Sequence, residues 1–208
     1  MVSQKIGACG SETKSREYRI RMLCGTSMLS AVAFLLMFME FPLPMFIPPF
    51  IKMDFSDLPA LIASFAYGPI SGVLVCLIKN LLHLFMTQSG GVGELANFIL
   101  GGVFALVAGI VYRCIHSKKG ALIASLSGTL VMAVVSIPTN YYIVYPFYTS
   151  FMPLDAIIQA YQAIIPSVSS LMECLLIFNF PFTLFKGIFA TVITFLIYKP
   201  LSPILKGR

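Results

Sequence analysis

The stretch "LPALIASFAYGPISGVLVCLIKNLLHLFM", residues 58–86, decides how this chain folds. It is almost continuously apolar. It is too long for one membrane-spanning helix, which needs about 20 residues, and too short for two full ones. The Gly68-Pro69 pair in its middle interrupts helices. The stretch therefore predicts a short helix over 57–67, followed by a longer one over 70–86.

The rest of the chain has the same apolar character. Of its 208 residues, 58% are hydrophobic and only 11% are charged, with a mean hydropathy of +0.91. A soluble domain carries about 25% charged residues, so lipid is the expected solvent. Further apolar segments predict spans over 22–41, 94–113, about 120–145 and about 173–198. We predict an all-α protein: one membrane domain, residues 1–208, with six transmembrane helices, the second of them short.

The basic residues are concentrated on one side of the predicted bundle. Six spans place both termini on the same side. Most of the 14 lysines and arginines fall there, in residues 1–21, 113–119 and 199–208. By the positive-inside rule this side is cytoplasmic, so 1–20 is expected to be a cytoplasmic tail and 42–57 and 146–172 outer loops. The net charge of +6 then reflects topology and not nucleic-acid binding. A polar N-terminus without a signal peptide fits a bacterial plasma membrane protein.

Polar side chains gather in the outer half of the predicted bundle. The candidate ligand-binding residues there are Gly93, Glu94, Asn97, Asn140, Thr183, Lys186 and Lys79. A charge in the middle of a membrane helix costs about 2.5–3.5 kcal/mol, so such lysines usually face a cavity or extend to the headgroups. The set suits a flat, neutral molecule with polar edges, although hydrogen bonds between helices explain it equally well.

Several kinds of chemistry are not indicated by the sequence. His83 and His116 stand alone, so each is expected to be structural, and no metal or resident cofactor is predicted. "GVGELAN" does not follow a strand as a dinucleotide fingerprint does, and there is no Walker A sequence. Without a nucleophile–base pair, an intramembrane enzyme is not favoured.

The segment "FIPPFIKMDFSDLPAL", residues 46–61, places three charges between two apolar stretches. We expect Asp57 to cap the short helix that follows. Asp54 is expected to pair with Lys52 or with another nearby lysine, and it is a further candidate ligand-binding residue.

Small residues four apart allow close helix packing, and they occur in two predicted helices. Ser27 and Ala31 lie in the first, and Gly101, Ala105 and Gly109 lie in the fourth. Packing within the bundle explains either set. For Ser27 and Ala31, docking of another membrane protein is the alternative.

Five segments together resemble one known family. They are "KMDFSDLPALIASFAYGPISGVLVCLIKNLLH" (52–83), "GVGELANF" (91–98), "PTNYY" (138–142), "PFTLFKG" (181–187) and the tail "YKPLSPILK". The chain resembles the substrate-binding S component of energy-coupling factor (ECF) vitamin transporters, in particular the riboflavin S component. The resemblance implies an outward-facing flavin pocket and docking onto a transmembrane coupling subunit served by two cytoplasmic ATPases.

The resemblance also implies residue roles. Asn140 and Lys186 would hold the polar edge of the flavin ring, and Glu94 with Gly93 would lie near the pocket mouth. Ser27 and Ala31 correspond to the family's Ala-xxx-Ala docking motif. The loop 42–57 would close over the pocket as a lid.

One position departs from the family pattern, because Thr183 stands where an asparagine is usual. Riboflavin would be the transported ligand, and flavin mononucleotide is possible. An S component for another vitamin (thiamine, biotin or folate) and a non-transporting membrane scaffold are the alternatives.

Overall fold

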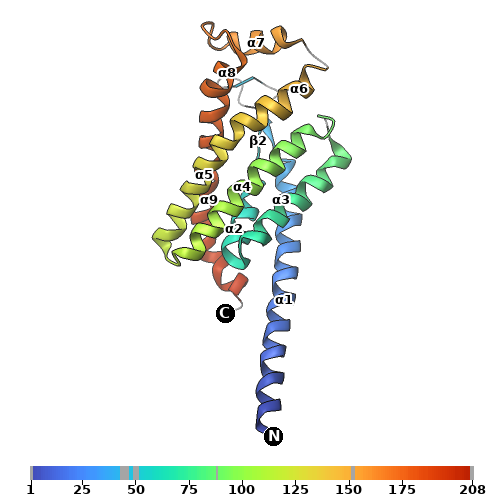
Figure 1. Cartoon of the computed structure of the whole chain (residues 1–208), viewed down its shortest axis with the longest axis vertical. Coiled ribbons are helices and arrows are strands. Elements are labelled where there is room, and N and C mark those ends of the chain that lie inside the picture. Colours follow the sequence, from blue (N-terminus) through green and yellow to red (C-terminus); the bar gives the residue numbers. More distant parts are fainter. Residues whose placement is uncertain (1, 43–46, 49–51, 88, 151–152, 207–208) are drawn as a thin grey trace.

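The computed structural model describes residues 2–42, 47–48, 52–87, 89–150 and 153–206. It is a helical bundle whose two termini lie at the same end (Figure 1). Its main helices are α1 (Val2–Met37), α2 (Asp57–Tyr67), α3 (Pro69–His83), α4 (Val92–Cys114), α5 (Lys118–Thr139) and α9 (Phe180–Lys206). Within the described residues, five helical segments are long and apolar enough to cross a membrane: 16–37, 69–86, 92–114, 119–148 and 171–197. With the short α2, they confirm the predicted all-α membrane bundle.

The shorter elements lie at the end of the bundle away from the termini (Figure 1). Strands β1 (Phe41–Pro42) and β2 (Lys52–Met53) pair antiparallel. A 3₁₀ turn, η1 (Leu84–Met86), follows α3. The remaining elements are α6 (Tyr145–Tyr148), α7 (Leu154–Gln162), α8 (Leu171–Cys174) and two π-helical turns, η2 (Asn140–Val144) and η3 (Leu175–Asn179).

The break within the apolar stretch falls where the sequence predicted it. Gly68 has φ +108°, a conformation that favours glycine, and Pro69 begins α3. A side chain at position 68 would also collide with the Arg113 guanidinium at the end of α4. The Gly-Pro pair therefore sets the corner between α2 and α3.

The N-terminal segment is helical. From Val2 onward, the residues expected to form a cytoplasmic tail (1–20) belong to α1, which runs on to Met37. The sequence there contains no proline to stop a helix, and its lysine, arginine and glutamate residues favour one. The apolar part also ends earlier than the expected residue 41, because Phe41 and Pro42 belong to β1.

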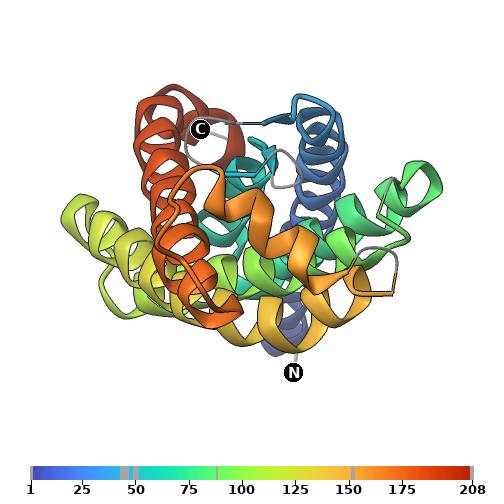
Figure 2. The same cartoon turned by 90° about the horizontal axis from the view of Figure 1, so that it is seen from above.

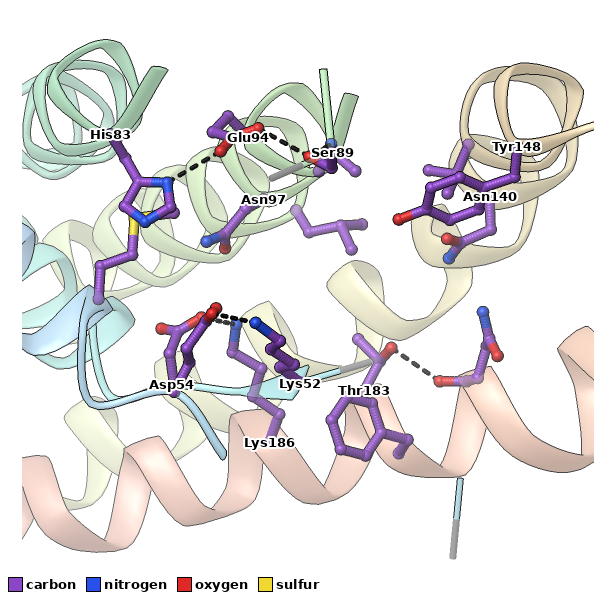
Figure 3. Close-up of a pocket in the computed structure, with 18 of the residues that line it drawn as sticks. Lys52, Asp54, His83, Ser89, Glu94, Asn97, Asn140, Tyr148, Thr183 and Lys186 are labelled. Carbon is purple, nitrogen blue, oxygen red and sulfur yellow. Dashed lines mark hydrogen bonds and ion pairs between the residues drawn. The ribbon is translucent and has the colours of Figure 1, made fainter. Parts of the chain in front are cut away.

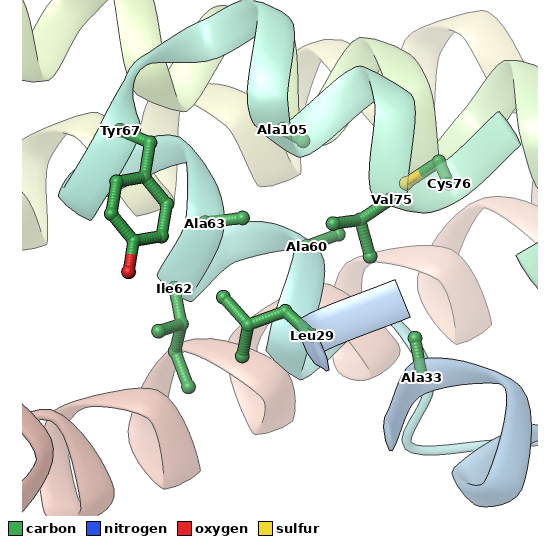
Figure 4. Packing of buried hydrophobic residues seen from close by; sticks show 9 residues of the cluster. All are labelled: Leu29, Ala33, Ala60, Ile62, Ala63, Tyr67, Val75, Cys76 and Ala105. Atoms are coloured by element: carbon green, nitrogen blue, oxygen red, sulfur yellow. The ribbon is translucent and has the colours of Figure 1, made fainter. Parts of the chain in front are cut away.

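Helix α2 is the buried centre of the bundle, in contact with α1, α3, α4 and α9. Figure 4 shows its small side chains facing α1 and α3. Ala60 and Ala63 are fully buried, as is Ala105 of α4, so these backbones approach closely. At Gly109, an added side chain would meet Ser64 and Pro69. The small residues of α4 thus pack within the bundle, as their spacing suggested.

A further apolar cluster lies at the end of the bundle away from the termini (Figure 1). It joins Ile47 of the loop between β1 and β2 to Ile157 and Tyr161 of α7 and to Leu175 of η3. Seen from above, α7 crosses over the bundle end (Figure 2). Residues 43–46 and 49–51 of the expected outer loop, and 151–152 of the next, lie outside the described residues.

Candidate functional site

A cavity of about 740 Å³ opens between the helix ends that lie away from the termini (Figure 1). This volume lies within the range of about 300–1,000 Å³ that is usual for small-molecule sites. The aromatic and apolar side chains of its wall include Phe38, Leu100, Met132, Tyr145, Tyr148, Ile157 and Phe182. The cavity is therefore large enough for a fused-ring ligand and has a wall that suits one.

The charged floor of the cavity is a buried cluster. Nζ of Lys186 on α9 lies 3.2 Å from Oδ2 of Asp54 and 3.1 Å from Oδ2 of Asp57. Lys79 on α3, fully buried, donates to Oδ1 of Asp57 at 2.7 Å and to Oγ of Ser56 at 2.6 Å. Two ammonium groups thus neutralise two carboxylates, and this pairing offsets the cost of removing all four charges from water.

Asp54 is ionised in this cluster. Burial by itself would raise the pKa of its carboxyl group, but the Lys186 and Lys79 ammonium groups and the hydrogen bonds from Ser56 outweigh it. The pKa is therefore held well below its usual value. Asp54 pairs with Lys186 and not with Lys52, whose partner is Glu40.

Two sequence expectations change here. Asp57 does not cap α2: Ser56 occupies the cap position and makes no side-chain cap bond, while Asp57 forms ion pairs. The buried lysines of α3 and α9 draw its carboxylate inward. Lys79 neither lines the cavity nor extends to a membrane surface, because Asp57 and Ser56 hold its ammonium group inside.

One wall of the cavity carries a second polar cluster, between the end of α3 and the start of α4 (Figure 3). Nδ1 of His83 lies 2.9 Å from Oε1 of Glu94, and Thr87 and Ser89 donate to Oε2 at 2.9 and 3.0 Å. The sequence suggested that His83 stands alone, but in the structure it contacts Glu94. The left-handed turn at Gly90 and Gly91 starts α4 so that Glu94 faces inward.

Both π-helical turns border the cavity. Pro138 removes a backbone donor from α5, and η2 begins two residues later with Asn140, whose Nδ2 donates to the carbonyl of Ser136 at 2.8 Å. The η3 turn ends with Asn179. Such turns shift the helix register and often occur at functional sites.

Most of the predicted site residues are brought together by the fold. The cavity is lined by Asp54, Gly93, Glu94, Asn97, Asn140, Thr183 and Lys186, and not by Lys79. Ser27 and Ala31 lie apart from it, exposed on α1. The sequence reasoning missed Glu40, Lys52, His83 and Asn179 as lining residues. Of these four, Asn179 was the easiest to predict from the sequence, because it stands four residues before Thr183 on the same helical face.

The fold and the cavity define a membrane-embedded protein that binds a small molecule. Residues 21–198 match the family model for the ECF transporter substrate-specific component. The chain therefore belongs to this family, whose members bind the substrate of a transporter. It is also similar to a solved structure described as the S component of a bacterial ECF transporter, with a TM-score of 0.72 at 34% identity over 90% of this chain and 99% of that one.

Curated relatives are similar in sequence over most of this chain and most of their own length. The riboflavin transporter RibU of Staphylococcus aureus is 37% identical, over 89% of this chain and 93% of its own length. The riboflavin transporter FmnP of Bacillus subtilis is also 37% identical, over 89% and 94%. RibU of Streptococcus thermophilus is 33% identical, over 89% and 84%.

Proposed function

We propose that this chain is the riboflavin-binding subunit of an ECF-type vitamin uptake transporter. The observation that carries the proposal is the cavity itself: aromatic and apolar walls around Asn140, Asn179 and Lys186, in a chain similar to riboflavin transporters over nearly its whole length. The isoalloxazine ring of riboflavin is flat and uncharged, with carbonyl and N–H groups along one edge. Aromatic and methionine side chains cover such a ring, while amides and an ammonium group bind its edge.

The charge pattern of the cavity disfavours a strongly anionic ligand. Lys186, which faces the cavity, is shared between Asp54 and Asp57, and Lys52 is bound to Glu40. The positive charges of the lining are thus already balanced by carboxylates. A strongly anionic vitamin such as folate would therefore require additional cations.

In this proposal, riboflavin enters from the outer side; the expected lid, residues 42–57, lies partly outside the described residues. Both termini are cytoplasmic. The chain performs no covalent chemistry, and partner ATPases drive release through a transmembrane coupling subunit. The exposed Ser27 and Ala31 on α1 provide a close-packing surface for that subunit.

Uptake of labelled riboflavin into vesicles tests this function. Vesicles should contain the chain with a coupling subunit and two ATPases, and ATP should be supplied on the cytoplasmic side. We expect accumulation that requires ATP and that unlabelled riboflavin suppresses, whereas excess thiamine or biotin leaves it unchanged. Suppression by another vitamin alone would assign the chain to that vitamin. Absence of both uptake and binding would favour the scaffold alternative.

A further inference from the structure

A buried chain of three polar side chains runs from α7 to the cavity wall. The hydroxyl groups of Tyr145 and Tyr161 are hydrogen-bonded to each other. Tyr161 also donates to Oδ1 of Asn179 at 3.0 Å. Tyr145 and Tyr161 are 1% and 0% exposed, and Asn179 is 5% exposed. Among the three, Tyr145 and Asn179 line the cavity, while Tyr161 lies behind them.

The direction of these hydrogen bonds orients the Asn179 amide. A tyrosine hydroxyl has one proton, and that of Tyr161 is used on the Asn179 oxygen, so Tyr145 must be the donor in the tyrosine pair. The amide oxygen therefore faces the tyrosines, and the NH₂ group lies on the other side. Asn179 also makes a side-chain hydrogen bond with Tyr145. An amide carries two N–H donors, and no described residue is seen to accept both, so one N–H is available to a ligand in the cavity.

Thr183, one turn further along α9, does not supply such a donor. Its hydroxyl is buried and donates to the backbone carbonyl of Asn179 at 2.7 Å (Figure 3). Asn140, across the cavity, donates its own amide N–H to Ser136 and so leaves its oxygen as an acceptor. The two asparagines thus offer opposite groups: Asn140 an acceptor and Asn179 a donor.

The two parts of the cavity have different chemistry. Glu94, Ser89 and His83 gather on one wall, whereas Asn140 and Thr183 lie away from them, beside the aromatic residues (Figure 3). Carboxylates accept hydrogen bonds from hydroxyl groups, so the first part suits the polyol chain of a ligand. The uncharged part, with one acceptor and one donor, matches an imide edge, where N–H and C=O groups alternate.

We propose that Asn179 is a ligand-binding residue that donates a hydrogen bond to a carbonyl oxygen on the flavin ring, and that Tyr161 of α7 is the positioning residue that fixes its amide. This inference rests on the proposed riboflavin-binding function and adds a specificity-determining contact to it. Because Tyr161 does not line the cavity itself, this residue of α7 takes part in ligand recognition only through Asn179.

The test compares riboflavin with lumiflavin, which has the same ring but no polyol chain, by flavin fluorescence on the purified full-length protein. We expect Asn179→Leu to weaken binding of both flavins by a similar factor of about ten. Tyr161→Phe keeps the ring and should weaken both about three-fold, and it should shift the carbonyl stretching band of bound flavin in the infrared. If Asn179→Leu does not fold, Asn179→Ser replaces it.

Asn80→Leu is the matched control, because Asn80 is a buried asparagine of α3 outside the cavity. It should keep the affinity for both flavins within about two-fold. Unchanged affinities in Asn179→Leu, or a loss limited to riboflavin, would overturn the inference. Failure of the wild-type protein to bind either flavin is a different result, which would reject the riboflavin function itself.

Discussion

Lys186 and Asp54 are 132 residues apart in the chain, yet Nζ of one lies 3.2 Å from Oδ2 of the other. Lys186 belongs to α9 and Asp54 to the segment between β2 and α2. Their ion pair joins the outer loop to the cavity floor. Lys186, a candidate ligand-binding residue, therefore also holds the segment between β2 and α2 in place. The first three predictions concern this ion-pair cluster.

Replacing Lys186 alone should damage both folding and binding. Lys186→Met leaves Asp54 and Asp57 with only Lys79, and loss of one partner from a buried ion pair costs about 3–5 kcal/mol. We expect lower thermal stability in detergent and loss of flavin binding. The double variant Lys186→Met/Asp54→Asn keeps the cluster neutral, so it should recover stability without recovering binding. Recovery of both would mean that Lys186 acts only on the fold.

Lys79→Met should separate stability from affinity. The Lys79 side chain does not line the cavity and serves Asp57 and Ser56. We expect a fall of about 3 kcal/mol in stability, but a change of less than about three-fold in the flavin affinity of the folded fraction. Thermal unfolding and a titration on the same preparation measure the two. A loss of affinity that exceeds the loss of stability would make Lys79 a direct binding residue.

The pH dependence of stability should show the contribution of the ionised Asp54 carboxylate to the fold. Its pKa is lowered in the folded state, from an unfolded value of about 3.9. Its contribution is therefore fully present above about pH 4 and is lost as the pH falls through the lower folded pKa. We expect the stability difference between wild type and Asp54→Asn to be constant from pH 8 to about 5 and to shrink below about 4. A difference that changes near neutral pH would contradict this assignment.

Thr183→Val should change flavin affinity little. The Thr183 hydroxyl of α9 donates to the carbonyl of Asn179 at the end of η3, and valine has nearly the same shape. Because that proton points to the backbone, its removal should alter affinity by less than about three-fold in a fluorescence titration. A loss of ten-fold or more would show that the hydroxyl itself binds the ligand.

Enlarging the small residues of α1 should block assembly but not binding. Ser27 and Ala31 are exposed and distant from the cavity. We expect Ser27→Leu/Ala31→Leu to bind flavin normally and to lose co-purification with the coupling subunit, because larger side chains keep the helices apart. Leu130→Phe, on the exposed face of α5, is the control and should still assemble. Normal assembly of the double variant would remove this surface from the proposal.

The fold was largely predictable from the sequence because lipid imposes simple rules. The length of the apolar segments predicted the membrane spans, and the Gly68-Pro69 pair predicted the corner between α2 and α3. Apolar length does not predict the helix over residues 2–20, because these residues are polar. Helix propensity was the signal that was available there.

The candidate site was predictable only in part. Polar residues in apolar segments pointed to Asn140 and Lys186, since such residues are rarely placed there without a role. The pairing of Asp57 with two lysines depends on which faces of α2, α3 and α9 meet, and spacing along the chain does not contain that information. Asn179 could have been found, because its four-residue spacing from Thr183 places both residues on the same helical face.

Titration of the purified protein with riboflavin, followed by flavin fluorescence, tests the central claim most directly. The chain has no tryptophan, so the flavin itself is the reporter. The account predicts saturable quenching with one riboflavin per chain, which Lys186→Met/Asp54→Asn abolishes while remaining folded. Folded wild-type protein that leaves flavin fluorescence unchanged, at any ratio of ligand to chain, would contradict it.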